Sequence, residues 1–231
     1  GDPGHGRVAG DDPSQDYTAN PSRWTAGLLI DDLHISHTEC GTALAMGGAA
    51  SMILKCTIDS AGDHVHVAGC SPIENDEGLG DWSDGITCLG PGHLIADNTI
   101  VNASDVGIVF FGGKDTIIWG NAVGANEGHY GMFAGIAVHP WWFGDVSGVQ
   151  VIDNVVVSKG DTDCGGMHTG INIGQHMWGR GCVSNPSLAA VGNTGTCTAE
   201  PAQPLGTLCT PGVLCQEWAY VAAGATFTLK N

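Results

Sequence analysis

Hydrophobic residues in the middle of the chain occur in short alternating runs, each opened by a Gly-Ile pair. The pairs lie at positions 85–86, 107–108, 135–136 and 170–171. Apolar and polar side chains alternate in a β-strand, because its successive side chains point to opposite faces. A further apolar run follows each of the first three pairs and leads to an asparagine. The pattern predicts many short strands separated by tight turns.

The asparagines Asn98, Asn121 and Asn154 recur at one place in this pattern. Asn98 and Asn121 are 23 residues apart, close to the length of one coil of a parallel β-helix, and Asp32 and Cys56 take the same place earlier. Stacked coils bring equivalent residues to ~4.8 Å from each other, so the amides can form a hydrogen-bonded ladder. A β-sandwich would give many strands but not this regular offset. We predict an all-β, right-handed, single-stranded parallel β-helix with an Asn ladder.

Alternation also assigns a face to each residue of the Gly-Ile strands. One set of side chains is expected to point into the helix: Ile86, Cys88, Ile108, Phe110, Ile136, Val138, Ile171 and Ile173. The other set is expected to point outward: Thr87, Leu89, Val109, Phe111, Ala137, His139 and Asn172.

Composition narrows the class of protein. The 231 residues include 37 Gly, which argues against a helical bundle because glycine is unfavourable inside helices. The net charge of −17 argues against nucleic acid or an anionic membrane as a partner. No apolar run of about 20 residues occurs, so we expect no membrane span. Nine cysteines favour an oxidising compartment and predict a secreted, extracellular protein.

The cysteines and the repeat together suggest three regions. Residues 1–26 are predicted to be an N-terminal arm or cap, and residues 27–180 the parallel β-helix. Residues 181–231 are predicted to be a disulfide-held, loop-rich excursion with a final partial coil that stops near a ladder position. An odd number of cysteines leaves at least one thiol that is unpaired or bonds to another chain; we predict that Cys88 is the free thiol and that Cys209–Cys215 is a local disulfide. Open coil ends would favour end-to-end self-association.

The segments Asp84-Gly85-Ile86, Asn98-Thr99-Ile100 and 105–109 make the chain similar to the pectin-lyase-like right-handed β-helix superfamily. In particular they resemble its secreted β-helix-repeat proteins of unassigned activity. The superfamily includes polysaccharide lyases, galacturonan hydrolases, phage tailspikes and adhesins. The resemblance therefore implies a partner that is a polysaccharide or a cell-surface glycan. The chain lacks the ordered motif set of the galacturonan hydrolases and a pectate lyase arginine motif.

Longer loops locate a candidate groove. Nine residues separate Asn98 from Gly107, but 14 separate Asn121 from Gly135 and 16 separate Asn154 from Gly170. Loops that exceed the minimal turn often carry function. We predict a groove beside the Gly-Ile strands, although the aromatic residues there could simply cap the loops. The predicted substrate-binding residues are Tyr130, Trp141, Trp142, Asp145, Asn172, His176, Trp178 and Arg180.

Acidic residues and histidines provide candidate chemistry. Asp84 and Asp105 precede Gly-Ile strands one coil apart, and glycosidases use two neighbouring carboxyl groups. With His139 and His168 they form the predicted catalytic set for a hydrolase or lyase, and their alternative role is to cap strand ends. His64 and His66 share one strand face and are a weak candidate metal pair.

Asp-rich turns also supply oxygen ligands of the kind that bind Ca²⁺, so Ca²⁺ is a candidate cofactor. The sequence therefore favours a secreted β-helix protein that binds or acts on a polysaccharide. The alternative is a non-catalytic structural or adhesin subunit that stacks into fibres through open β-helix ends.

Overall fold

The computed structural model describes residues 26–62, 83–126, 132–143, 146–158, 167–173, 188–191, 194–197, 217–221 and 227–230. In these residues the chain forms 19 strands and no helix. Within the same residues, no helix long and apolar enough to cross a membrane is found.

The strands form three sheets in which each strand pairs in parallel with the strand three places later. The first sheet contains β1 (Leu29–Asp31), β4 (Met52–Leu54), β7 (Leu94–Ala96), β10 (Ile117–Trp119), β13 (Gln150–Ile152), β16 (Leu188–Val191) and β19 (Phe227–Lys230). The second contains β2 (His34–Thr38), β5 (Thr57–Ala61), β8 (Thr99–Val101), β11 (Ala122–Ala125), β14 (Val155–Ser158) and β17 (Thr194–Cys197). The third contains β3 (Leu44–Met46), β6 (Ile86–Cys88), β9 (Val106–Gly112), β12 (Met132–Phe143), β15 (Met167–Ile173) and β18 (Glu217–Val221).

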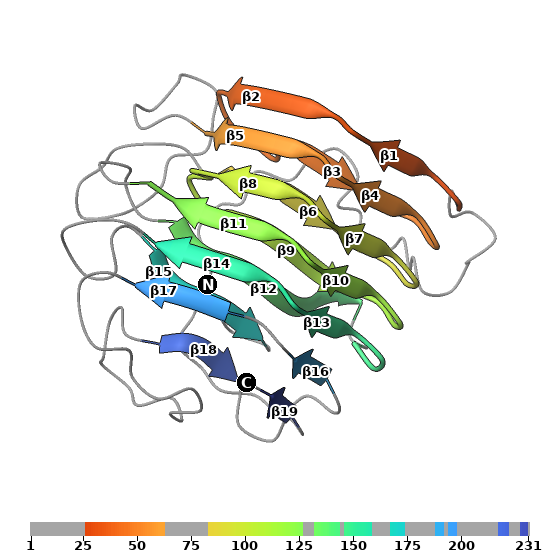
Figure 1. Cartoon of the computed structure of the whole chain (residues 1–231). Helices are drawn as coiled ribbons and strands as arrows, with labels where there is room; N and C mark the ends of the chain where they lie inside the picture. The colour runs from red at the N-terminus through yellow and green to blue at the C-terminus, as the bar shows by residue number, and fades with distance from the viewer. Residues whose placement is uncertain are drawn as a thin grey trace, which may run out of the picture.

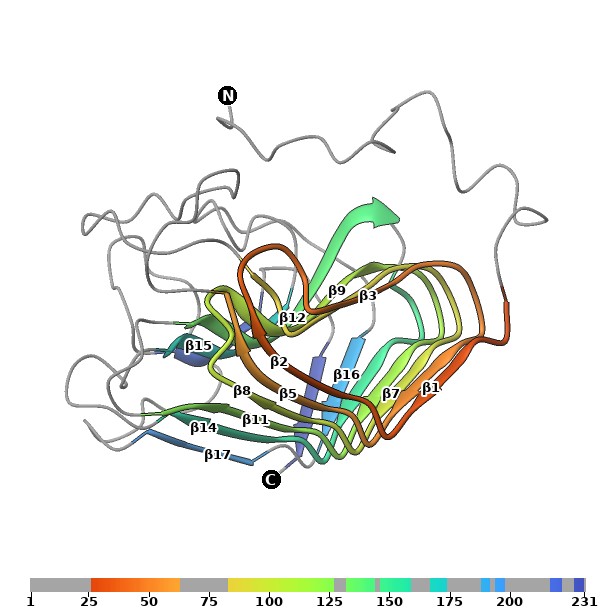
Figure 2. The same cartoon turned by 90° about the horizontal axis from the view of Figure 1, so that it is seen from above.

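The chain thus visits the three sheets in turn and returns to the first one a coil further on. Figure 1 shows the strands stacked from β1 and β2 at one end to β18 and β19 at the other. Figure 2 looks at the stack from above, with the first coil in red and orange and later coils behind it. This is the arrangement of a parallel β-helix, and it confirms the all-β prediction. A sandwich is ruled out by the parallel pairing throughout the described ladders.

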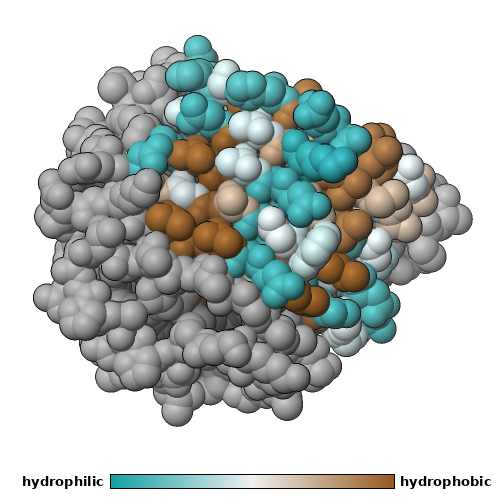
Figure 3. Space-filling model, viewed as in Figure 1, coloured by the Kyte–Doolittle hydropathy of each residue, from teal (hydrophilic) through white to brown (hydrophobic). Residues whose placement is uncertain are grey.

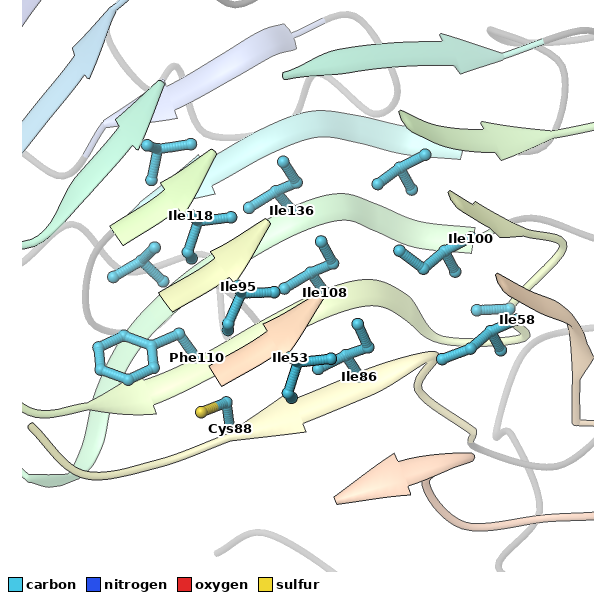
Figure 4. Packing of buried hydrophobic residues seen from close by; sticks show 14 of the residues in the cluster. Ile53, Ile58, Ile86, Cys88, Ile95, Ile100, Ile108, Phe110, Ile118 and Ile136 are labelled. Carbon is cyan, nitrogen blue, oxygen red and sulfur yellow. The ribbon is translucent and has the colours of Figure 1, made fainter. Parts of the chain in front are cut away.

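Isoleucines fill the interior of the coils. Ile53, Ile95 and Ile118 of the first sheet are fully buried and face Ile86, Ile108 and Ile136 of the third (Figure 4). The structure confirms the predicted inward direction of the Gly-Ile strand residues whose side chains it describes. All of them belong to one cluster of buried apolar side chains: Ile86, Cys88, Ile108, Phe110, Ile136, Val138 and Ile171. Burial of one such side chain stabilises the fold by about 1.5–3 kcal/mol.

The glycine of the Gly-Ile pair is required by close packing between coils. A Cβ added to Gly107 would lie 2.6 Å from the backbone oxygen of Gly135 and would overlap the side chain of Val123. A Cβ on Gly85 would likewise meet the backbone oxygen of Gly107 at 2.6 Å. Each glycine therefore lets the backbone of the next coil approach.

Asparagine side chains connect the coils at the turn between the first and second sheets. Asn98 Nδ2 donates to Asn121 Oδ1 at 2.9 Å, and Asn121 Nδ2 donates to Asn154 Oδ1 at 2.9 Å. All three side chains are buried. The backbone N–H of Cys56 donates to Asn98 Oδ1 at 2.8 Å, which extends the column by one coil.

The prediction that Asp32 takes the asparagine position is wrong by one residue. Ile30 pairs with Ile53, so Asp32 aligns with Lys55 and Leu33 aligns with Cys56. Asp32 and Lys55 both have a left-handed backbone, with φ of 55° and 52°. Each of them is the first residue of the two-residue turn between the first and second sheets. The ladder asparagines occupy the second residue of that turn.

Cys56 and Cys88 are both buried and free. The prediction of a free Cys88 is confirmed, but Cys88 is not the single unpaired thiol. Burial raises the pKa of Cys88 to about 12, so the side chain behaves as a small apolar group. Cys40 is disulfide-bonded. Cys209 and Cys215 lie outside the described residues.

Candidate functional site

Two carboxyl groups lie at the start of neighbouring strands of the third sheet. Asp84 comes just before β6 and Asp105 just before β9, and these strands pair through Ile86 and Ile108. The backbone N–H of Asp105 donates to the carbonyl oxygen of Ser83 at 3.0 Å. The coil-to-coil ladder therefore holds the two aspartates side by side.

Asp84 is held in place by a chain of hydrogen bonds. The Thr87 hydroxyl donates to Asp84 Oδ2 at 2.7 Å, and the backbone N–H of Val106 donates to Asp84 Oδ1 at 3.3 Å. The hydroxyl groups of Thr42 and Thr87 are hydrogen-bonded to each other at 2.6 Å. Donors on both carboxyl oxygens favour the ionised form of Asp84.

Asp105 lies in a different environment. Its Oδ1 atom is buried and has no hydrogen-bond partner among the described residues. Burial raises the pKa of Asp105 well above 3.8, and the negative charge of Asp84 raises it further. One carboxyl group is therefore stabilised in its charged form by donors, and its neighbour is stabilised in its protonated form.

The outer face of the third sheet is covered. Val109 and Ala137 point away from the core, as predicted, but both are fully buried in a second apolar cluster with Val106 and Ala134. Phe111 and Phe133 pack against this cluster. The outward side chains of these strands are mostly apolar and are themselves removed from water.

Two polar residues share this covered face. His139 is 8% exposed, and its ring meets that of Phe111 edge-on with centroids 6.3 Å apart. Asn172 is 3% exposed, and its Oδ1 atom has no hydrogen-bond partner in the described part of the chain. Strand register places Asn172 in one row with Ala137, Val109 and Thr87. At the other end of this row, Thr87 donates its hydroxyl hydrogen bond to Asp84.

The structure describes only part of the predicted groove. Trp141 and Trp142 lie in the last residues of β12, which bends away from the stacked strands (Figure 2), and His168 lies in β15. The side chains of these three residues are outside what the structure describes. Other predicted site residues are entirely outside the described ranges: His64, His66, Tyr130, Asp145, His176, Trp178 and Arg180.

Within the described residues, no group of three or more His, Cys, Asp or Glu side chains is placed to hold a metal ion. The predicted Ca²⁺ site therefore has no described ligand set. Sequence reasoning gave no role to Thr42 and Thr87, although both belong to the Asp84 network. They are 45 residues apart, and only the stacking of coils brings them together.

Comparison with known proteins identifies no family for this chain. No family model matches the chain, and no curated protein matches it. Among solved structures, the chain is similar to the Streptococcus pneumoniae surface protein and adhesin PfbA. The TM-score is 0.38 at 11% sequence identity, over 89% of this chain and 67% of that one.

Proposed function

We propose that this protein is an extracellular right-handed β-helix protein of the pectin-lyase-like type that binds a polysaccharide in a groove beside its third sheet, at the end where Asp84 and Asp105 lie. The carboxyl pair Asp84 and Asp105 is proposed as the reactive centre of that site. The observation that carries the proposal is the contrast between the two carboxyl environments. A buried carboxyl group with a raised pKa beside a hydrogen-bonded carboxyl group is an arrangement typical of acid–base sites.

In the proposed hydrolysis, Asp105 is the general acid and Asp84 the base or nucleophile. A protonated Asp105 donates its proton to the oxygen of the glycosidic bond as that bond breaks. Ionised Asp84 either accepts a proton from the attacking water or attacks the sugar carbon itself. A lyase would instead need a base that removes a carbon-bound proton, for which His139 and His168 are the candidates.

Asn172 and the aromatic residues are proposed to bind the glycan. The Asn172 Oδ1 atom is a buried acceptor that a sugar hydroxyl could satisfy. Trp141 and Trp142 would stack on sugar faces, and Tyr130, Asp145, His176, Trp178 and Arg180 would complete the walls of the groove. Acidic surface charge favours a neutral glycan, because a uronate polymer would be repelled by a net charge of −17.

A second candidate function is recognition without cleavage. The Asp105 Oδ1 atom is buried, and a buried carboxyl group can hold a hydroxyl without reaching a glycosidic oxygen. In this case the protein would be a surface module of the adhesin kind.

A glycan array followed by a reducing-end assay separates these functions. We expect binding of at least one polysaccharide, reduced by Asp105→Asn and by Asp84→Asn. Asp59→Asn is the matched control, since Asp59 is half-buried but lies on β5 of the second sheet. Cleavage by the wild type that both site variants abolish supports the hydrolase. Binding without new reducing ends supports recognition, and no binding to any glycan contradicts both.

A further inference from the structure

The hydroxyl groups of two threonines form a hydrogen-bond chain that ends on Asp84. The Thr87 hydroxyl oxygen lies 2.7 Å from Asp84 Oδ2, and the Thr42 and Thr87 hydroxyl oxygens are 2.6 Å apart. A hydroxyl group has one hydrogen to donate, and an ionised carboxyl group only accepts. With Asp84 ionised, Thr87 donates to it, so Thr42 must be the donor to Thr87. The chain therefore has one direction, from Thr42 to the carboxyl group.

Three successive coils hold this chain in place. The backbone N–H of Ala43 donates to the carbonyl oxygen of Asp84 at 2.9 Å, which fixes the adjacent Thr42 beside the next coil. Thr87 lies on that coil, in β6, and is 7% exposed. The coil after it supplies the backbone N–H of Val106, which donates to Asp84 Oδ1 at 3.3 Å. Donors from its own coil and from the following coil thus reach the Asp84 carboxyl group.

The coil of Asp105 has no equivalent of Thr87. Thr87 pairs with Ala45 of β3 and with Val109 of β9, and neither of these residues has a hydroxyl group. Val109 takes the place of Thr87 on the coil of Asp105, and its apolar side chain donates no hydrogen bond. The Asp105 Oδ1 atom has no hydrogen-bond partner among the described residues. The difference between Thr87 and Val109 therefore accompanies the difference between the two carboxyl groups.

We propose that Thr42 and Thr87 are positioning residues that hold Asp84 as the ionised member of the carboxyl pair. The inference rests on the proposed function of the pair, in which Asp84 is the base or nucleophile and Asp105 the acid. Removal of a donor from a carboxylate destabilises its charged form. Without the threonine chain, the two carboxyl groups would become more alike, and their roles would be less distinct.

Carboxyl-carbon NMR titration of the full chain tests the proposal without any glycan, with the Asp84 resonance assigned by its loss in Asp84→Asn. Thr87→Val replaces the hydroxyl group by a methyl group and should shift the titration midpoint of Asp84 upwards. Thr87→Ser retains the hydroxyl group and should titrate as the wild type does. Thr42→Val should cause a smaller upward shift, because Thr87 still donates to Asp84 but loses the donor that polarises its own hydroxyl group.

Thr99→Val is the matched control for the loss of a threonine hydroxyl group from a strand. Thr99 is exposed on β8 of the second sheet. This sheet lies on the side of the molecule that Figure 3 shows, where hydrophilic and hydrophobic residues are mixed. The Asp84 midpoint should be the same in Thr99→Val as in the wild type, because β8 and β6 belong to different sheets.

Two results would overturn the proposal. An Asp84 midpoint that stays unchanged in both Thr87→Val and Thr42→Val, with unchanged far-UV circular dichroism, excludes a role of the hydroxyl chain. Thr42→Val decides alone if Thr87→Val does not fold. A shift in Thr87→Ser as large as that in Thr87→Val assigns the effect to packing instead of hydrogen bonding.

Failure of the proposed function gives a different result, because the protein then binds and cleaves no polysaccharide whatever the Asp84 midpoints are. Where the wild type cleaves a glycan, the acidic limb of its pH–rate profile should move upwards in Thr87→Val and stay in place in Thr87→Ser. An acidic limb that does not move, although the Asp84 midpoint does, would show that the threonines do not position Asp84 for the reaction.

Discussion

The negative charge of Asp84 raises the pKa of Asp105 across the boundary between two coils. The residues are 21 positions apart in the chain, yet β6 and β9 place them at the same end of the third sheet. Burial is the larger cause of the raised pKa, and the neighbouring charge adds to it. Asp84 in turn receives hydrogen bonds from Thr87 and from the backbone of Val106.

Replacement of Asp105 by Asn should stabilise the protein, and the gain should grow with pH. The pKa of Asp105 is raised in the folded state above 3.8, so the folded protein holds a proton that the unfolded chain releases. Stability from this group is fully present below pH 3.8 and is lost as pH rises towards the folded-state pKa. The loss can reach about 1.4 kcal/mol per pH unit in that interval.

Urea unfolding of Asp105→Asn and wild type at several pH values measures this gain. The two proteins should be similar near pH 3 and should diverge as pH increases. Asp59→Asn serves as the control and should show no such trend. A variant that is less stable than wild type at neutral pH would mean that the Asp105 carboxylate is stabilised by the fold.

His93 should make the protein less stable in mild acid. The side chain is 1% exposed, its Nδ1 atom accepts from the backbone N–H of Ser51 at 3.3 Å, and its Nε2 atom lies 3.0 Å from the Leu89 carbonyl oxygen. Burial lowers the pKa of His93 below 6.5, and the hydrogen bonds to backbone groups only partly oppose this. The unfolded chain therefore takes up a proton before the folded protein does.

Stability from His93 is accordingly present above pH 6.5 and is lost as pH falls through 6.5 towards the folded-state pKa. The expected slope is at most about 1.4 kcal/mol per pH unit for this one group. Chemical unfolding between pH 7.5 and 5.0 should show a shallower slope in His93→Gln than in wild type. An unchanged slope would mean that His93 titrates equally in both states.

Asn121 should be one of the most sensitive positions in the chain. Its Oδ1 atom accepts from both the backbone N–H and the side-chain amide of Asn98, and its own Nδ2 donates to Asn154. Asn121→Ala would leave buried donors of Asn98 without a partner, at about 1–3 kcal/mol for each unsatisfied group. Thermal unfolding should show a large loss of stability.

The matched control is Asn126→Ala, because the Asn126 side chain is exposed. That change should alter stability by less than about 0.5 kcal/mol. Similar losses at Asn121 and Asn126 would argue against a structural role for the buried asparagine column.

The repeat in the sequence was sufficient to predict the coils. A parallel coil imposes a period on chain length, and the small Gly107 and the buried Ile108 recur because each coil meets the next in the same way. The position of Asp32 was harder to predict. Two adjacent turn residues differ in backbone conformation but not in hydrophobic pattern, and the pattern alone does not separate Asp32 from Leu33.

The candidate site was only partly predictable for a related reason. Alternation correctly assigned Val109 and Asn172 to the outer side of their strands, but alternation does not tell whether another part of the protein covers that side. Both residues are buried. The Thr42–Thr87 hydrogen bond joins residues that are 45 positions apart and lie on neighbouring coils, and no local signal in the sequence marks it.

Carboxyl-carbon NMR titration of Asp105 tests the central claim most directly, with its resonance assigned by its loss in Asp105→Asn. We predict that Asp105 in the wild type titrates well above 3.8, that Asp84→Asn lowers its pKa without restoring 3.8, and that Asp59→Asn leaves it unchanged. Titration of Asp105 near 3.8 in the wild type, unaffected by Asp84→Asn, would contradict the account.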